Sequence, residues 1–163
     1  MEIKRKFLID QLEANGKEFV NYFSQFSETE ASVPPAPEQW SVRQIAIHMR
    51  DTEEQVFLLR SERALTGEHP TVAMFVQEEW SKEHPADAEA FEKIVADFRA
   101  ARRKLIRLLR NTSNRKWNDY ALHPKLGKLT VGVMAIFNYS HSLEHLAQLI
   151  DIHEKAVLKQ INA

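Results

Sequence analysis

The stretch WSVRQIAIHMRD, residues 40–51, predicts a helix whose start and inward face can both be assigned. Ser41 is a favourable N-cap, and Gln44 three residues later completes a capping box. His48 shares the inward face of this helix, so a histidine is expected to point into the core. That face is defined by residues at helical spacing: Ile45, Met49, Thr52, Val56 and Leu59.

Three further stretches have helical periodicity, at residues 3–26, at 87–110 and after Thr130. Proline costs about 3 kcal/mol inside a helix, and all six prolines fall between these stretches. No strand alternation competes with the helical pattern. The residues expected to face the core are, in the first helix, Phe7, Leu8, Leu12, Phe19, Tyr22, Phe23 and Phe26; in the third, Phe91, Ile94, Val95, Phe98, Leu105, Leu108 and Leu109; and in the fourth, Met134, Phe137, His141, His145, Gln148, Leu149 and Ile152.

Four amphipathic helices of this length predict an all-α fold, an antiparallel-type four-helix bundle formed by one domain over residues 1–163. Residues 31–39 are expected to be a loop. Residues 66–86 form a long connection between helices 2 and 3, with a short helix ending near Trp80. Gly16 is expected to weaken the first helix locally.

Composition limits the partners and the compartment. The formal net charge of −1 gives no general reason to expect nucleic acid or an anionic membrane as a partner. The sequence has no apolar run of about 18 residues, so no membrane-spanning helix is expected. The N-terminus lacks the apolar region of a secretory signal. The chain has no cysteine, which excludes thiolate ligands and is consistent with a cytoplasmic protein.

His141 and His145 lie four residues apart on the predicted fourth helix. Side chains at this spacing share one face, about 5–6 Å apart at Cβ, close enough to hold one metal ion. Burying each ring without a partner costs about 1–3 kcal/mol, and a shared metal removes that cost. With His48 as a third ligand, the set would leave an open coordination position, as in catalytic metal sites. The alternative for any one of them is a buried, hydrogen-bonded histidine without a metal.

Other polar side chains are candidates for supporting roles, although no catalytic residue can be assigned. Asp51, three residues after His48, and Glu144, next to His145, could orient an imidazole or accept a proton from metal-bound water. We favour a solvated side chain for Glu144, while Asp51 stays undecided. His123 could line a cavity mouth. HSLEH at 141–145 also fits an inverted zinc-protease signature, which we reject because only residues 146–163 follow for a distant acidic ligand.

Eight basic side chains and no acidic ones occur between residues 99 and 116. They could form an anion-binding or nucleic-acid-binding surface. We favour a solvated helix end that complements the helix dipole, because aromatic residues for base stacking are missing until Trp117. The basic residues are Arg99, Arg102, Arg103, Lys104, Arg107, Arg110, Arg115 and Lys116.

Three segments together resemble the DinB/YfiT-like metal-binding four-helix bundles. They are residues 35–53 around QWSVRQIAIHMRD, residues 123–130 (HPKLGKLT) and residues 141–145 (HSLEH). The resemblance implies a divalent metal, usually zinc, nickel, iron or manganese, bound by three histidines that match His48, His141 and His145. It also implies frequent homodimers.

Members of this family include metal-dependent hydrolases and enzymes that transfer low-molecular-weight thiols, such as bacillithiol or mycothiol, onto electrophiles. The resemblance therefore implies a hydrolase or thiol transferase acting on a small molecule, in a stress or detoxification setting. Because the chain has no cysteine, a transferase would need the thiol as a cosubstrate. The alternative is a non-catalytic metal-binding or regulatory bundle.

Overall fold

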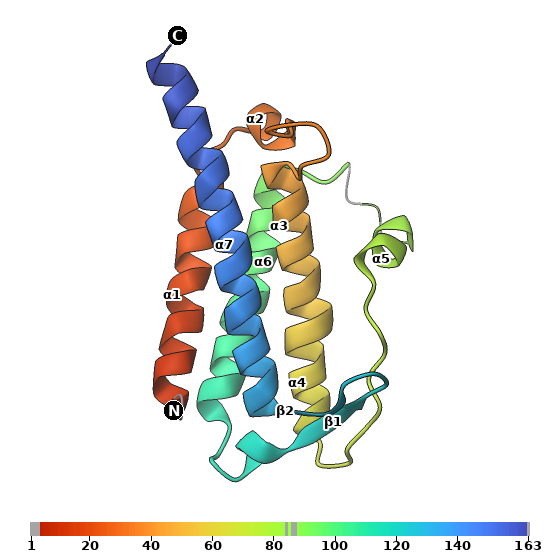
Figure 1. Ribbon diagram of the computed structural model, residues 1–163. Coiled ribbons are helices and arrows are strands. Elements are labelled where there is room, and N and C mark those ends of the chain that lie inside the picture. The colour runs from red at the N-terminus through yellow and green to blue at the C-terminus, as the bar shows by residue number, and fades with distance from the viewer. Residues whose placement is uncertain (1–3, 84, 86–87, 163) are drawn as a thin grey trace.

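Four long helices form a bundle in the computed structural model, which describes residues 4–83, 85 and 88–162 (Figure 1). They are α1 (Arg5–Phe23), a composite helix of α3 (Val42–Asp51), η1 (Thr52–Leu58) and α4 (Leu59–Ala64), then α6 (Phe91–Asn111) and α7 (Val131–Ile161). The predicted helical bundle is confirmed. Ile3 and Asp87, the expected starts of two helices, lie outside the described residues. No helix among the described residues is long and apolar enough to cross a membrane.

The connections differ in detail from the prediction. The first helix ends at Phe23 rather than Phe26, because Ser27 forms a capping box with Glu30 and starts the short helix α2 (Glu28–Ser32). The helix expected in the long connection is present as α5 (Gln77–Glu83). A 3₁₀ turn, η2 (Lys116–Asn118), follows α6.

The composite helix and α6 run in the same direction, while α1 and α7 both run the opposite way (Figure 1). Ion pairs from Arg50 to Glu89 and from Glu62 to Lys104 match this parallel arrangement. The simple antiparallel-type arrangement was therefore wrong for this pair. The long connection explains the difference, because it carries the chain from the end of α4 back along the whole bundle before α6 begins.

A β-hairpin precedes α7, although no strand was predicted there. Strands β1 (Tyr120–His123) and β2 (Gly127–Thr130) pair antiparallel, from Tyr120 opposite Thr130 to His123 opposite Gly127. Gly127 has a φ of 70°, which glycine adopts without strain. Four-residue strands are too short to show alternation in the sequence, so the pattern could not have revealed them.

The π-helical segment η1 shifts the buried face of the composite helix by one residue. Ile45 and Met49 are buried as predicted, but Val56 is only partly buried and Leu59 is exposed. Phe57 is buried instead. A π turn contains an extra residue, which rotates everything after it by about 100° relative to a regular α-helix. The predicted face was therefore wrong beyond Thr52, and the same shift brings Glu53 into the core.

Two apolar clusters fill the bundle, one at each end, and a buried polar layer separates them. We call this layer the arginine cluster; it consists of Arg102, Glu53, Asn138 and Ser142, all buried. Arg102 Nε and Nη2 donate to the two oxygens of the Glu53 carboxylate, at 2.6 and 2.8 Å. Nη2 also donates to Asn138 Oδ1 and Ser142 Oγ, both at 3.0 Å, and Nη1 donates to the Leu12 carbonyl at 2.9 Å.

The arginine cluster corrects two sequence expectations, and a third fails at the end of α1. Arg102 was assigned to a solvated basic surface, yet it is buried. Gly16 makes this possible, since a Cβ there would lie 2.8 Å from Arg102 Cγ. Phe137 was expected in the core but is 47% exposed, because its neighbour Asn138 takes the inward position to join the cluster. Phe7 is likewise exposed, at the outer edge of α1.

Candidate metal centre

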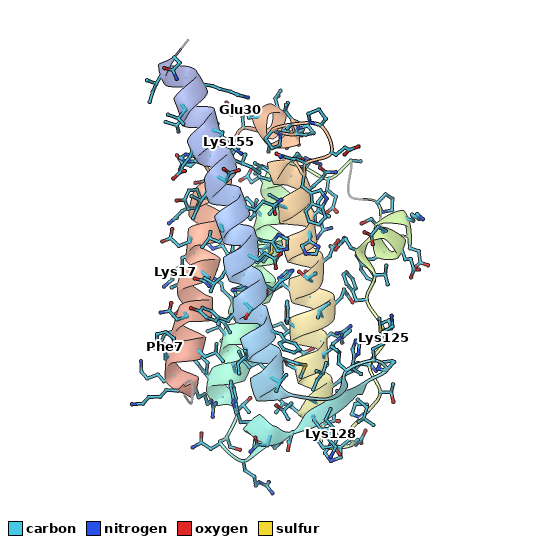
Figure 2. All side chains as sticks on the ribbon, in the orientation of Figure 1. Phe7, Lys17, Glu30, Lys125, Lys128 and Lys155 are labelled. Carbon is cyan, nitrogen blue, oxygen red and sulfur yellow. The ribbon has the colours of Figure 1, made fainter. Side chains whose placement is uncertain are left out.

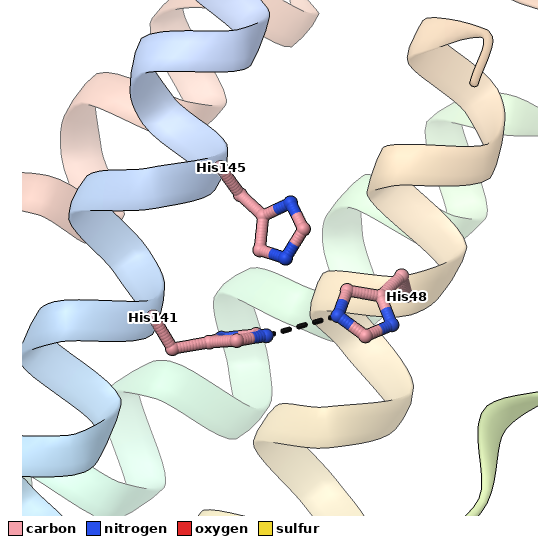
Figure 3. Close-up of side chains that lie close together, drawn as sticks. All are labelled: His48, His141 and His145. Atoms are coloured by element: carbon pink, nitrogen blue, oxygen red, sulfur yellow. Dashed lines mark hydrogen bonds between the residues drawn. The ribbon is translucent and has the colours of Figure 1, made fainter. Parts of the chain in front are cut away.

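Three imidazole rings from two helices converge inside the bundle (Figure 3). His48 comes from α3, while His141 and His145 lie one turn apart on α7. The Nε2 atoms of His48 and His141 are 2.9 Å apart, and one nitrogen from each ring lies within 4.8 Å of the others. The structure therefore brings together the three histidines predicted from the sequence.

The environment keeps two of these rings neutral. Burial, together with the positive charges of His145, His48 and Arg102, lowers the pKa of His141 to about 3. Burial also lowers the pKa of His48, assisted by His145 and opposed by the hydrogen bond to Gln77. A neutral imidazole has a free lone pair, which is the form that binds a metal.

The outward nitrogens of two rings are held by amide oxygens. His48 Nδ1 lies 3.0 Å from Gln77 Oε1, and His145 Nδ1 lies 3.0 Å from Gln148 Oε1. Each bond places the proton on Nδ1 and leaves the lone pair on Nε2, the usual arrangement for a metal-binding histidine. Neither glutamine was predicted from the sequence to take this role. Gln148 could have been found by its spacing of three from His145, whereas Gln77 lies in the long connection.

The arrangement fits a divalent cation. The Nε2 atoms of His48 and His141 face each other at 2.9 Å, while the other nitrogen of His141, Nδ1, is buried without a hydrogen-bond partner in the described part of the chain. Two lone pairs at that separation repel each other unless one nitrogen carries a proton. In a tetrahedral site with bonds of 2.0–2.1 Å the ligand nitrogens are about 3.3 Å apart, so the His48 and His141 nitrogens are already near the spacing that one ion requires.

Aromatic side chains enclose the three rings. Trp40 stacks on His145 with ring centroids 6.0 Å apart and planes at 3°, and it also contacts the His48 ring at 5.0 Å. Phe57 lies against His141 at 5.6 Å, in the position that the π turn gives it. The two aromatic side chains restrict the directions from which solvent and small molecules can approach the histidines.

A surface hollow of about 520 Å³ borders His145. Its wall contains Trp40 and three carboxylates, from Glu38, Glu144 and Asp151, and no basic side chain. The volume is in the range of small-molecule sites in proteins. The full lining is Pro35, Glu38, Gln39, Trp40, Glu144, His145, Gln148, Asp151 and Ile152.

The two candidate carboxylates occupy different environments. Asp51 is buried and accepts from Arg50 Nε at 2.9 Å and from Gln77 Nε2 at 3.0 Å, so it reaches His48 through the glutamine. Glu144 is exposed and lines the hollow beside His145.

His123 lies at the hairpin turn rather than at the wall of the hollow. Its Nδ1 accepts the backbone N–H groups of Lys125 and Leu126, at 3.2 and 3.1 Å. Burial lowers its pKa, and the charges of Arg60 and Lys125 lower it further. The His123 ring therefore stabilises the turn between β1 and β2 by accepting its backbone N–H groups.

Comparisons with known proteins agree with this architecture. A family model described as the DinB superfamily matches residues 11–149. No curated protein matches the chain with significant similarity. Among solved structures, the chain is similar to YfiT from Bacillus subtilis, described as a probable metal-dependent hydrolase with an unusual four-helix bundle topology. The TM-score is 0.81 at 18% identity, over 95% of this chain and 90% of that one.

Two further structures share the fold. The four-helix bundle protein TT2238 aligns with a TM-score of 0.63 at 17% identity, over 91% of this chain and 99% of that one. The colibactin self-resistance protein ClbS, solved in complex with a dsDNA, aligns with a TM-score of 0.69 at 17% identity, over 92% of this chain and 95% of that one. At these identities the likeness shows the fold alone.

The ClbS complex contradicts the expectation that nucleic acid is excluded as a partner. That expectation depended on the formal net charge of −1. Net charge is a poor guide, because contact with DNA depends on where basic side chains gather on the surface, and an acidic face elsewhere can offset them in the total.

Proposed function

This chain belongs to the DinB superfamily, and from that premise we propose that it is a divalent-metal-dependent hydrolase acting on a small molecule. The observation that supports this most strongly is the convergence of His48, His141 and His145 beside a hollow of substrate size. The description of YfiT, a protein of the same fold, as a probable metal-dependent hydrolase also supports it.

In the proposal, the three Nε2 atoms are the metal ligands. A divalent ion with three neutral ligands keeps its full charge and lowers the pKa of a water in its open coordination position toward ~7. Gln77 and Gln148 hold the His48 and His145 rings in the ligand orientation. Trp40 and Phe57 shield the rings and reduce solvent access.

The hollow gives an expectation for the substrate. Glu38, Glu144 and Asp151 line it without a basic side chain, although Lys155 pairs with Asp151. Carboxylates in the wall repel an anionic group, so we propose a neutral or cationic substrate. Esters and amides with matched neutral, cationic and anionic side groups would test this preference directly.

The proposal is tested by metal analysis of protein purified without a histidine tag, alongside the His141→Ala variant. We expect about one divalent ion per chain in the wild type and a loss of that ion in the variant. Hydrolysis of the ester and amide panel should depend on the metal and disappear with a chelator. Wild-type protein that binds no divalent ion, after incubation with zinc, nickel, iron and manganese in turn, would refute the proposal.

The same assay separates hydrolysis from the related chemistries. Turnover of an electrophile that requires added bacillithiol or mycothiol would identify a thiol transferase instead, with the thiol taking the place of water at the metal. Stoichiometric metal without turnover of either kind would favour a metal-binding bundle that is not a catalyst.

A second candidate function is contact with duplex DNA through the exposed face of α6. Arg99, Arg103 and Arg107 share that face at intervals of four residues, and none has a carboxylate partner among the described residues. The dsDNA complex of ClbS favours testing this surface. We expect an affinity that falls with salt and a shallower salt dependence when the three arginines are changed to glutamine. Binding that is absent at low salt would remove this candidate.

A further inference from the structure

Gln77 is the first residue of α5, and its amide group lies between His48 and Asp51. The oxygen Oε1 is 3.0 Å from His48 Nδ1, and the nitrogen Nε2 is 3.0 Å from both Asp51 Oδ2 and Ser81 Oγ. A residue in the long connection therefore joins the histidine site to a buried carboxylate.

The orientation of this amide follows from its neighbours. Asp51 accepts a hydrogen bond from Arg50 Nε at 2.9 Å, and Arg50 Nη1 donates to Glu89 at 2.8 Å. The ionised carboxylate of Asp51 can only accept, so the Gln77 group facing it must be the NH₂. The amide oxygen then faces His48, and an oxygen in that position can only accept a hydrogen bond from Nδ1–H.

We propose that Gln77 is a positioning residue that fixes His48 in the Nδ1–H tautomer and so directs the Nε2 lone pair at the point shared with His141 and His145. The expected consequence, a higher metal affinity, rests on the proposed function. The tautomer itself is a property of the metal-free protein and does not depend on that proposal. His48 Nε2 then accepts from His141 Nε2–H across 2.9 Å when no ion is bound.

The chain Arg50–Asp51–Gln77–His48 also explains why Asp51 is buried at this position. In many metal sites a carboxylate accepts the outward N–H of a ligand histidine directly. Here the glutamine spans the gap, and the carboxylate acts by setting the direction of the amide. No described residue of α5 is buried, and the Gln77 side chain links this helix to α3 through His48 and Asp51.

The first test is NMR of the metal-free protein with ¹⁵N-labelled histidine, which reads the tautomer of each ring. We expect His48 to carry its proton on Nδ1 in the wild type. In Gln77→Met, which keeps the length of the side chain but lacks the acceptor, we expect the Nε2–H form to become populated. A wild-type His48 ring protonated mainly on Nε2 would overturn the inference.

The second test is zinc affinity by competition with a chromophoric chelator. Losing an outer hydrogen-bond partner of a ligand histidine typically costs 10- to 100-fold in metal affinity, which is the loss we expect for Gln77→Met. Ser81→Ala is the matched control, because it removes a partner of the same amide nitrogen without touching His48, and it should stay within about twofold of the wild type.

The outcomes separate this inference from the proposed function. Equal zinc affinity in the wild type and Gln77→Met overturns the role of Gln77 and leaves the metal site standing. If the wild type binds none of zinc, nickel, iron and manganese, the proposed function is refuted, while the NMR result still decides the tautomer. If Gln77→Met is poorly folded, Gln77→Ala replaces it, because it also removes the acceptor at His48 Nδ1 and should let the Nε2–H form become populated.

Discussion

Two polar clusters lie close together inside this bundle, and they differ in whether their hydrogen bonds are complete. In the arginine cluster, the charges of Arg102 and Glu53 face each other, and Asn138 and Ser142 fill the remaining positions. In the histidine cluster, His141 Nδ1 has no partner among the described residues and the inward nitrogens face each other. The first cluster is complete without a ligand, whereas the facing Nε2 atoms of the second leave a place for a cation.

The comparison shows how one helix pair can serve both stability and binding. Ser142 directly follows His141 on α7, and Glu53 follows His48 by five residues on the composite helix. The arginine cluster therefore fixes the two helices that present the histidines. Rigid support of this kind is what a metal site requires, because ligand geometry must be held without help from the ion.

The largest expected effect comes from breaking the arginine cluster. Arg102→Met leaves the Glu53 charge buried and unpaired, which typically costs 3–5 kcal/mol in the free energy of unfolding. Urea unfolding measures this loss. Arg103→Met, the neighbouring exposed arginine, should change stability by less than about 0.5 kcal/mol. In the double variant Arg102→Met/Glu53→Leu part of the loss should return, and a double variant worse than either single change would contradict the pairing.

Metal should stabilise the protein only through the histidine cluster. At a free zinc concentration 100 times the Kd, the free energy of unfolding should rise by about 2.7 kcal/mol. His141→Ala should abolish this increase, as measured by urea unfolding with zinc and with EDTA. His153→Ala is the control, because His153 lies on α7 with His141 but packs against Tyr22 and Phe26, away from the three rings. An increase that survives in His141→Ala would place the metal elsewhere.

Acid should destabilise the metal-free protein through His141. The pKa of this ring is about 3 in the folded protein and about 6.5 in the unfolded chain. Between these two pH values the unfolded chain therefore binds one proton more than the folded protein does. The contribution of His141 to the free energy of unfolding is fully present above about pH 6.5 and is lost as the pH falls toward 3. Between pH 7 and pH 5 the loss is about 2 kcal/mol.

The His141→Ala variant isolates this contribution, since His48 also has a lowered pKa and acts in the same direction. Denaturant unfolding in EDTA at several pH values gives the slope of the free energy of unfolding against pH. We expect this slope to be smaller for the variant, by the equivalent of about one bound proton. Parallel curves for the two proteins would show that His141 titrates normally in the folded state.

The smallest effect is expected at Glu144, the carboxylate next to His145 in sequence. It is exposed, so Glu144→Gln should leave zinc affinity within about twofold and stability within about 0.5 kcal/mol of the wild type. Any effect on turnover would then reflect its place in the hollow. A large loss of zinc affinity would instead make Glu144 part of the metal centre.

Several features could be predicted because they depend on local physics. The capping box at Ser41 and Gln44 is present as expected, since it needs only four consecutive residues. The spacing of His141 and His145 places both rings on one helical face whatever the rest of the chain does. The position of His48 on an inward face also followed from spacing, because it precedes the π turn.

Other features depended on contacts between distant segments. The π turn shifted the burial of Val56, Phe57 and Leu59, and it brought Glu53 within reach of Arg102, 49 residues away. Gln77 reaches His48 from a connection 29 residues downstream. Hydropathy patterns cannot predict such pairs, because they describe one element at a time.

The amino-acid sequence by itself determined the four helices, the family resemblance and the identity of the three histidines, because short-range periodicity and capping encode them. Tertiary structure alone decided which polar side chains meet. The direction of the composite helix relative to α6, the burial of Arg102 and the contact of Gln77 with His48 all arise from packing. Figure 2 shows side chains from every long helix meeting in the interior. Hydrogen bonds there form only between groups that the whole fold has already brought within about 3 Å.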